Sequence, residues 1–426
     1  MLSSLGTNVL IIKQKFKENR VVIESILAAS YFIGIIMWTV HNKKLSFKLL
    51  SQAHRSSHLR KLKNSIEVFL KHGPFSSGFD QAAQATAVTK NDPTEYFGKR
   101  IMVLKPPISS REKGVLYIMF SELIADIPRL FDMKKLLDDY ILVLEPSWSG
   151  YCEIGILQYT LFDNEVFVLS AENDDFRFLS QLKSNLVPIR LGPCDWVDPR
   201  ISEKFLSGKK QFDIVMNSHW GDSKRHYVLF EALKKLPTSL GVALIGVPWR
   251  GNNKSVVQQL AKYYRVEQQI TFFERIPYEE VMKICCESKL GILLSLKEGS
   301  NRALAEIIFC DTPVILLNNH VGGIRKNIVD QTGIITDEKN LPQSISRIVG
   351  EYHKFSPRKW AVENISCFAS SQKLNDIIRK RTVGQGREWS KDIACRSNSP
   401  ESRYCYDSDS KMLNDFNHNL RNYLIK

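Results

Sequence analysis

Short apolar segments that alternate with segments of helical periodicity are the feature that most constrains the fold of this chain. Between residues 98 and 208 the apolar segments are RIMVLK, GVLYIMFS, YILVLEP, EVFVLSA and LVPIRLG, and helical periodicity at 122–139, 151–162 and 173–184 separates the later ones. Strands that are apolar on both faces are typical of parallel sheets covered by helices on both sides. This part of the chain is therefore predicted to form one α/β domain.

The same alternation starts again after residue 208. Its expected strands are FDIVMNS, GVALIGV, QITFFE, LGILLSL, TPVILLN and TGIITD, and they predict a second doubly wound domain at 209–355. In such sheets ligands bind beyond the carboxyl ends of the strands, where helix N-termini offer free N–H groups to anions. The residues that follow each strand are therefore the candidates for a binding site.

A length of 426 residues allows two such domains, because a single core stops growing at about 250 to 300 residues. The predicted organisation is an N-terminal basic segment at 1–45, a linker with one helix (59–71) at 46–97, a Rossmann-like domain at 98–208, a second doubly wound domain at 209–355, and C-terminal helices and tail at 356–426. The fold class is α/β, with an N-terminal apolar helix.

That helix is expected at residues 21–40, VVIESILAASYFIGIIMWTV, which are apolar except for Glu24. Twenty helical residues span about 30 Å, the thickness of the hydrocarbon core of a bilayer. We predict a membrane-spanning or membrane-embedded helix in an intracellular protein. The alternative is a helix buried against the body of the protein. A cleaved signal peptide fits less well, because no small-residue cleavage site follows.

The net charge is concentrated near the N-terminus. Residues 1–100 hold 15 Lys and Arg against 6 Asp and Glu, whereas the whole chain carries +14. We expect residues 13–48 to contact anionic lipid headgroups, and we do not expect the protein to bind nucleic acid. The alternative is a solvated charged arm. The eight cysteines show no CxxC pair and no Cys/His metal spacing, which predicts reduced, mostly buried thiols and no metal site.

The segment SLKEGSNRALAEIIFCDTPVIL, residues 295–316, carries two carboxylates, Glu298 and Glu306, directly after an apolar strand. Ser300 or Asn301 can cap the helix that follows. The amides at the start of this helix would face a phosphate, with hydroxyl groups bound by one acid on each side. A sugar nucleotide has this layout, although two acids eight positions apart also occur by chance.

Cations stand near this segment in the predicted fold. His219, Lys224 and Arg225 lie where the strand FDIVMNS gives way to a helix, and Arg302 opens the helix between the two acids. Positive groups there can neutralise a diphosphate that a helix terminus already favours. The alternative is that the Lys-Arg pair merely solvates the end of a helix.

Two other loops contribute candidates. Gly322 and Gly323 follow the strand TPVILLN, and glycine allows the backbone to approach a ligand closely. In the first domain, Trp148 and Tyr151 follow the strand YILVLEP and could stack on an acceptor sugar. A packed aromatic loop is the alternative for this pair.

The second domain resembles the donor-binding domain of retaining glycosyltransferases of family 4, which have the GT-B fold. The matching blocks are NSHWGDSKRHYVLFEAL, GILLSLKEGSNRALAEIIFCDTPVIL and NHVGGI, within about residues 212–335, and the first domain matches only as a Rossmann-like half. The resemblance implies two Rossmann-like domains facing across a cleft, an acceptor domain at 98–208 and a nucleotide-sugar-binding domain at 209–355. It also implies transfer of a sugar from a nucleotide sugar, with retention at the anomeric carbon and without a metal or other cofactor.

The resemblance further implies roles for single residues. In the family, the acid at Glu306 holds the ribose hydroxyls and the acid at Glu298 holds the hydroxyls of the donor sugar. The loop from Gly299 to Asn301 gives amides to phosphate and sugar, and Lys224 pairs with the diphosphate. We take Glu298 and His219 as the candidate catalytic residues.

Two positions depart from the family pattern. His219 stands where the family usually has Arg, and a neutral imidazole binds a diphosphate less strongly than a guanidinium. Arg225, in place of the usual Gly, or Arg302 could compensate. The predicted function is a hexosyl- or related glycosyltransferase acting on a glycan, polysaccharide or lipid-linked acceptor. The alternatives are a weak or inactive partner or scaffold protein and a nucleotide-sugar epimerase.

Overall fold

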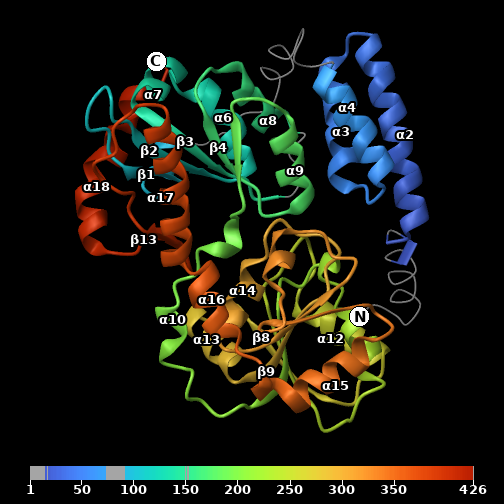
Figure 1. Cartoon of the computed structure of the whole chain (residues 1–426). Coiled ribbons are helices and arrows are strands. Elements are labelled where there is room, and N and C mark those ends of the chain that lie inside the picture. The colour runs from blue at the N-terminus through green and yellow to red at the C-terminus, as the bar shows by residue number, and fades with distance from the viewer. Residues whose placement is uncertain (1–14, 17, 73–91, 149, 151–152, 426) are drawn as a thin grey trace. The chain divides into compact units, whose positions relative to one another are not determined.

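The computed structural model describes the chain except for residues 1–14, 17, 73–91, 149, 151–152 and 426 (Figure 1). The described residues divide into two compact units. The six-stranded unit contains Pro193–Ser370 and Ser397–Glu401, and the five-stranded unit contains Lys15–Gly192, Ser371–Arg396 and the chain from Ser402 onward.

The six-stranded unit is built on a parallel sheet. Its strands are β6 (Phe212–Asn217), β7 (Gly241–Gly246), β8 (Gln269–Glu274), β9 (Ser288–Leu293), β10 (Val314–Leu317) and β11 (Gly333–Thr336). They lie in the order β11-β10-β9-β6-β7-β8, and every neighbouring pair is parallel. All six strands predicted from the sequence are therefore confirmed.

Helices cover both faces of this sheet. They are α10 (Arg200–Glu203), α11 (His226–Leu233), α12 (Lys254–Tyr263), α13 (Tyr278–Cys286), α14 (Arg302–Phe309), α15 (Leu341–Glu351) and α16 (Pro357–Ile365). Side chains alternate between the faces along a strand: Ile214 packs in one apolar cluster with Phe230 of α11, and Val215 packs in another with Ile308 of α14. The predicted doubly wound arrangement is thus explained by strands that are apolar on both sides.

The strand order creates a switch point between β6 and β9. These two strands are neighbours, but the chain leaves β6 toward β7 on one side and leaves β9 toward β10 on the other. The loops after them diverge, and in sheets of this order ligands bind in the crevice that the divergence opens. The loops after β6 and β9 carry most of the residues that the sequence singled out.

The five-stranded sheet is simpler. Its strands are β1 (Ile101–Lys105), β2 (Gly114–Met119), β3 (Tyr140–Glu145), β4 (Val166–Leu169) and β5 (Leu186–Ile189), in sequential order. The pairs from β2 to β5 are parallel, as predicted, but β1 is antiparallel to β2. Only residues 106–113 join these two strands, and a parallel connection needs a dozen or more residues. The expectation of a wholly parallel sheet was therefore wrong for β1.

The helices of the five-stranded unit include α6 (Ser121–Leu130), α7 (Met133–Asp139), α8 (Ile154–Leu157), α9 (Asn173–Gln181) and α18 (Asp407–Asn419), whereas α17 (Cys367–Gly384) continues from the other unit. The helix α9 lies within the range expected at 173–184, but α8 covers only four residues of the range expected at 151–162. The single helix expected at 122–139 is divided into α6 and α7. Asp132 ends the continuity, because its side chain caps α7 by accepting a hydrogen bond from the backbone N–H of Lys135 at 3.1 Å.

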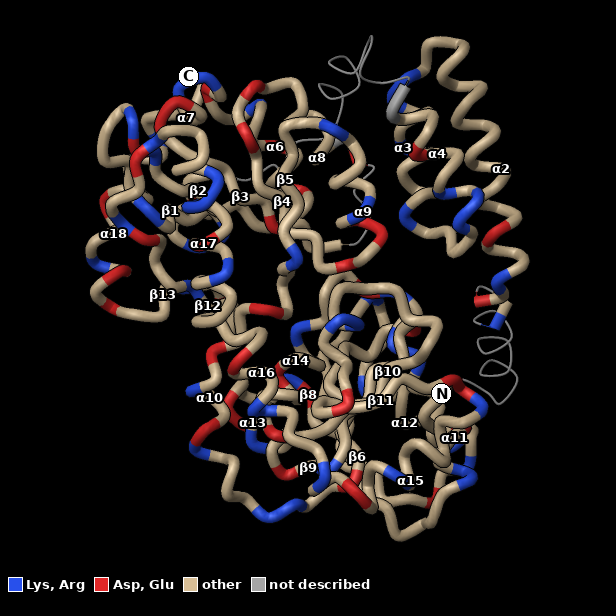
Figure 2. The backbone as a smooth tube through the Cα atoms, in the orientation of Figure 1, with Lys and Arg blue, Asp and Glu red and all other residues tan. Residues whose placement is uncertain are grey.

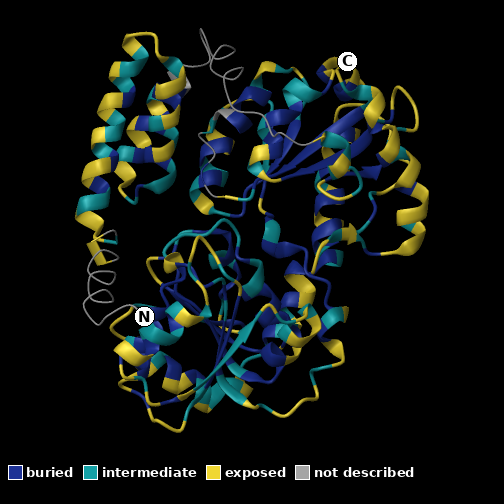
Figure 3. Cartoon of the chain, turned by 180° about the vertical axis from the view of Figure 1, so that it is seen from behind, coloured by how far each residue is buried: buried dark blue, intermediate teal, exposed yellow. Residues whose placement is uncertain are grey.

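Three N-terminal helices, α2 (Arg20–Thr39), α3 (Lys43–Ser56) and α4 (Arg60–His72), pack on the five-stranded unit. Leu27, Leu50 and Ile66 join the apolar core of the sheet. Lys63 of α4 pairs with Asp174 of α9 at 3.1 Å. In Figures 1 and 3, α2 lies on the side of α3 away from α9, and its outer edge is exposed.

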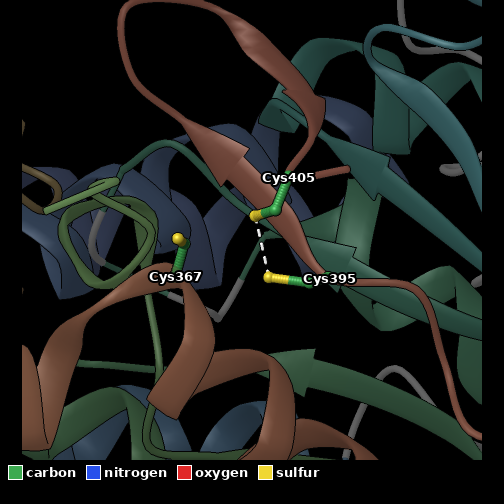
Figure 4. Close-up of side chains that lie close together, drawn as sticks. All are labelled: Cys367, Cys395 and Cys405. Carbon is green, nitrogen blue, oxygen red and sulfur yellow. Dashed lines mark hydrogen bonds between the residues drawn. The ribbon is translucent and has the colours of Figure 1, made fainter. Parts of the chain in front are cut away.

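A short hairpin lies near the C-terminus, formed by β12 (Arg396–Asn398) and β13 (Ser402–Tyr404). Cys395 and Cys405 flank it, with their sulfur atoms 2.7 Å apart (Figure 4). All seven cysteines in the described part of the chain are free and all but Cys395 are buried, which agrees with the predicted thiols. No periodicity or motif indicates this hairpin, which lies in the expected tail.

Candidate functional site

The loops after β6 and β9 bring Lys224 and Glu298 together. Nζ of Lys224 donates a hydrogen bond to Oε1 of Glu298, and the two side chains are only 9% and 14% exposed. The pair joins the lysine expected to bind a diphosphate to the acid expected to bind sugar hydroxyls. Burial strengthens the attraction of such a pair but adds the free energy of removing both charges from water.

His219 lies beside this pair, stacked on Trp249 with ring centroids 4.9 Å apart and an interplanar angle of 21°. The backbone N–H of Gly221 donates to Nδ1 of His219 at 3.0 Å, which places the proton of a neutral ring on Nε2. Burial, and then the charge of Lys224, lower the pKa of His219. At neutral pH the ring therefore offers one N–H donor and no charge.

Arg225 is turned into the protein. Its guanidinium donates to the carbonyl oxygen of Leu294 at 3.2 Å, to the hydroxyl of Tyr227 at 3.1 Å and to Oε1 of Glu338 at 2.9 Å. The backbone of Arg225 has φ 57°, in the left-handed region that favours glycine. Glycine adopts this conformation more readily than arginine, but the side chain of Arg225 is held by these three protein groups.

The loops after β9 and β10 are joined through their backbones. The N–H of Glu298 donates to the oxygen of Val321 at 2.9 Å, and the N–H of Gly323 donates to the oxygen of Gly299 at 2.7 Å. A Cβ on Gly322 would lie 2.8 Å from the oxygen of Glu298. At these glycines the backbone therefore closely approaches the loop after β9, which carries Glu298.

The start of α14 agrees with the sequence analysis. The side chain of Asn301 accepts a hydrogen bond from the N–H of Leu304 at 2.8 Å, which makes Asn301 the N-cap, and the helix begins at Arg302. Ser300 instead donates to the sulfur of Cys194 at 2.7 Å. The first turn of α14 leaves backbone N–H groups near Glu298, as an anion site requires.

Glu306 lies one turn inside α14 and is 3% exposed. Its Oε1 accepts a hydrogen bond from the hydroxyl of Tyr278 at 2.9 Å and lies 3.2 Å from Nε of Arg302. Burial raises the pKa of Glu306, and the charge of Arg302 opposes that rise. The structure thus divides the predicted site into a Lys224–Glu298 pair and a separate cluster around Glu306.

Two residues of that cluster, Tyr278 and Ser399, were not predicted from the sequence. Tyr278 begins α13 shortly after β8, so its position after a strand could have identified it. Ser399 lies 93 residues beyond Glu306, and a distant serine in a polar tail carries no local signal.

The predicted acceptor residues are less informative. Trp148 is exposed after β3, whereas Tyr151 lies outside the described residues. Glu145, at the end of β3, is buried, and its Oε2 accepts a hydrogen bond from the hydroxyl of Tyr117 at 2.6 Å. The same oxygen lies 3.4 Å from Nη1 of the buried Arg396, so the carboxylate of Glu145 is already paired inside the five-stranded unit.

Several solved structures are similar to the chain. Sucrose-phosphate synthase from Thermosynechococcus elongatus shares 14% identity at a TM-score of 0.47, over 63% of this chain and 74% of that one. HepE from Anabaena, solved in complex with UDP, shares 13% identity at a TM-score of 0.48, over 62% of this chain and 78% of that one. A UDP-forming α,α-trehalose-phosphate synthase from Burkholderia xenovorans shares 10% identity at a TM-score of 0.46, over 77% of this chain and 81% of that one. These are distant likenesses, and the ligands belong to those proteins.

No curated protein matches the chain. A family model does match part of it, and the match runs through the region that holds the paired loops. Residues 197–354, less than half of the chain, match the family described as "Glycosyl transferases group 1", and this stretch contains all six strands of the six-stranded sheet.

Proposed function

We propose that the six-stranded unit binds a nucleotide sugar and that the protein is a retaining, family 4-like hexosyl- or related glycosyltransferase. The observation that carries this proposal is the Lys224–Glu298 pair at the switch point of a doubly wound sheet, beside the N-terminus of α14. The family match over residues 197–354 supports it. The acceptor we propose is a glycan, polysaccharide or lipid-linked sugar.

Donor binding would exchange the partners of the pair. A diphosphate carries more negative charge than Glu298 and can replace it on Lys224, and the released carboxylate can then accept hydrogen bonds from the sugar hydroxyls. Nε2–H of His219 lies on the same loop and can donate to a phosphate oxygen. After this exchange Lys224 faces the diphosphate, and Glu298 is hydrogen-bonded to neutral hydroxyl groups.

The same groups suit the chemistry of transfer. As the bond to the leaving diphosphate breaks, negative charge grows on the diphosphate and positive charge grows on the sugar ring. Lys224 and the amides of α14 would stabilise the first, and Glu298 the second, which is electrostatic catalysis by preorganised groups. Retention would follow if the acceptor attacks from the side of the leaving group and passes its proton to a phosphate oxygen. We propose that no metal takes part.

One observation favours a second function. His219 is neutral where a guanidinium is usual, and Arg225 is held by other protein groups. A nucleotide-binding but catalytically weak or inactive partner protein would have these features. The alternative of an epimerase has no comparable observation in its favour.

Binding and transfer assays with UDP-, GDP- and ADP-sugars separate these functions. The enzyme function predicts transfer or slow hydrolysis by the wild type and loss of both in Lys224→Ala. Binding without turnover would favour the partner protein. If no nucleotide sugar binds at millimolar concentration, the enzyme function is excluded and an inactive partner or scaffold protein remains.

We also propose that the protein is associated with a membrane through residues 21–40. One described helix, α2, is long and apolar enough to cross a bilayer. The exposed apolar side chains of residues 21–40 are Val21, Ile26, Phe32, Ile33, Ile36 and Val40. Residues 15–72 hold eleven Lys and Arg against three Asp and Glu, and Figure 2 shows the Lys and Arg positions along these helices. Such a surface suits anionic lipid headgroups.

Polar contacts on the other side of α2 favour a helix that lies in the membrane surface over one that crosses it. The buried carboxylate of Glu24 accepts hydrogen bonds from the hydroxyl of Ser57 and the backbone N–H of His58, both at 2.6 Å. The hydroxyl of Ser46 donates to the oxygen of Gly34 at 2.6 Å. Crossing the bilayer would break these contacts or draw the polar helix α3 into the hydrocarbon.

A further inference from the structure

Three side chains converge on one oxygen of the Glu306 carboxylate. Oε1 lies 2.9 Å from the hydroxyl of Tyr278, 3.1 Å from the hydroxyl of Ser399 and 3.2 Å from Nε of Arg302. The two hydroxyl oxygens are themselves 2.8 Å apart. Because each hydroxyl has one proton, the triangle holds two protons, and at least one of them must be donated to Glu306.

Ser399 reaches this cluster from the tip of the C-terminal hairpin, residues 397–401, which belongs to the six-stranded unit. The tip is fixed at further points. The backbone oxygen of Asn398 accepts a hydrogen bond from Arg302 at 2.6 Å, and its N–H donates to the oxygen of Trp196 at 2.9 Å. The serine is therefore held in place by its own loop as well as by the acid.

The contacts leave the two oxygens of Glu306 in different situations. Among the residues that the structure describes, the hydrogen bonds and the ion pair of this carboxylate all go to Oε1. These contacts fix the rotation of the carboxylate and leave Oε2 to accept from a ligand. One carboxylate oxygen has two lone pairs and can accept from two neighbouring hydroxyl groups.

We propose that Tyr278 and Ser399 are positioning residues for the nucleoside end of the donor site. They hold Oε1 of Glu306 so that Oε2 accepts hydrogen bonds from the ribose hydroxyls. This inference rests on the proposed function, and it adds the C-terminal hairpin to the donor site. A ribonucleotide is then distinguished from its 2′-deoxy analogue through residues that never touch the ribose.

The test measures binding of UDP, GDP and ADP to the wild-type full-length chain by calorimetry. The tightest nucleotide and its 2′-deoxy analogue are then compared in Ser399→Ala and Tyr278→Phe. We expect each variant to weaken ribonucleotide binding about tenfold and to change binding of the deoxy analogue less than threefold. Ser399→Thr, which keeps the hydroxyl, should bind the ribonucleotide like the wild type.

Ser402→Ala is the matched control, because its hydroxyl lies on the same hairpin and contacts the sulfur of Met102 at 3.0 Å. Thermal unfolding of every variant detects loss of the fold, and Tyr278→Phe keeps the inference testable if Ser399→Ala does not fold. Equal weakening of both nucleotides, or no weakening of either, would overturn the positioning role while leaving the proposed function intact. A wild type that binds none of the three nucleotides would instead refute the proposed function.

Discussion

The hydrogen bond from Nζ of Lys224 to Oε1 of Glu298 links the loop after β6 to the loop after β9. Each side chain is the counter-charge of the other in a mostly buried position. A diphosphate that binds Lys224 must therefore supply the free energy of separating this pair.

Replacing Lys224 should remove one counter-charge of the mostly buried Glu298 carboxylate. We expect Lys224→Met to lower the free energy of unfolding by about 3 kcal/mol, the lower end of the range for buried pairs. Lys224→Met combined with Glu298→Leu should recover most of that loss. The exposed pair of Lys204 and Glu279, 2.9 Å apart, is the control, and Lys204→Met should change stability by less than about 1 kcal/mol. If urea unfolding shows that Lys224→Met and Lys204→Met lower the free energy of unfolding equally, Lys224 and Glu298 do not form a buried, coupled pair.

A guanidinium at position 219 should strengthen binding of a diphosphate. The pKa of His219 is lowered, so its ring is neutral at pH 7 and contributes a single N–H donor. His219→Arg adds a charged hydrogen bond, worth about 1.5 kcal/mol or roughly tenfold in affinity. His219→Gln, which stays neutral and keeps a donor, should change affinity little. Calorimetry with the nucleoside diphosphate decides, and a His219→Arg variant that binds no tighter would show that position 219 does not face the phosphates.

Nucleotide binding should weaken at a higher pH than an ordinary carboxylate would allow. Burial raises the pKa of Glu306, and only its ionised form offers Oε2 fully to hydroxyl groups. Affinity measured from pH 8 downward should therefore fall as the pH drops through this raised pKa. Glu306→Gln should bind more weakly and remove this dependence. The same fall in Glu306→Gln would assign the titration to another group.

The effect of pH on folding stability through Glu306 is opposite in direction to its effect on nucleotide affinity. The folded pKa of Glu306 lies above that of the unfolded chain, about 4.3 for Glu, so the folded state binds the proton more readily. The stability that this group contributes is fully present below the unfolded pKa and is lost as the pH rises through the folded pKa. Stability and nucleotide affinity should therefore change in opposite directions across this interval.

Local patterns in the sequence predicted the features that depend on neighbouring residues. The six strands of the six-stranded sheet follow from continuous apolar segments, and Asn301 caps α14 because its side chain reaches an N–H three residues ahead. The contact of Ser399 with Glu306 depends on the path of a distant hairpin. The inward direction of Arg225 depends on Glu338, which follows the edge strand β11. No periodicity or motif in the sequence predicts either arrangement.

The exposed face of α2 should bind anionic bilayers. We expect Phe32→Asp and Ile36→Asp to reduce flotation with vesicles of phosphatidylcholine and phosphatidylglycerol at least tenfold, because a charge on that face would enter the interface. Val68→Asp changes an exposed apolar residue on α4 and is the control. Extraction of the bound wild type by alkaline carbonate is expected of a helix in the membrane surface. Resistance to extraction would favour a spanning helix.

Oxidation should join Cys395 and Cys405 without disturbing the tip of the hairpin. Their sulfur atoms face each other 2.7 Å apart, and the N–H of Cys405 donates to the oxygen of Cys395 at 2.9 Å, so the backbone is already paired there. Thiol–disulfide exchange with oxidised glutathione would form the protein disulfide, release two glutathione thiols and lower the protein mass by two hydrogens. Closing this loop of about eleven residues should raise the free energy of unfolding by about 2 to 3 kcal/mol. Cys405→Ser should show neither change.

Because the disulfide would hold the hairpin in its present form, nucleotide affinity of the oxidised protein should stay within twofold of that of the reduced protein. A large loss of affinity would show that the tip must move when a donor binds.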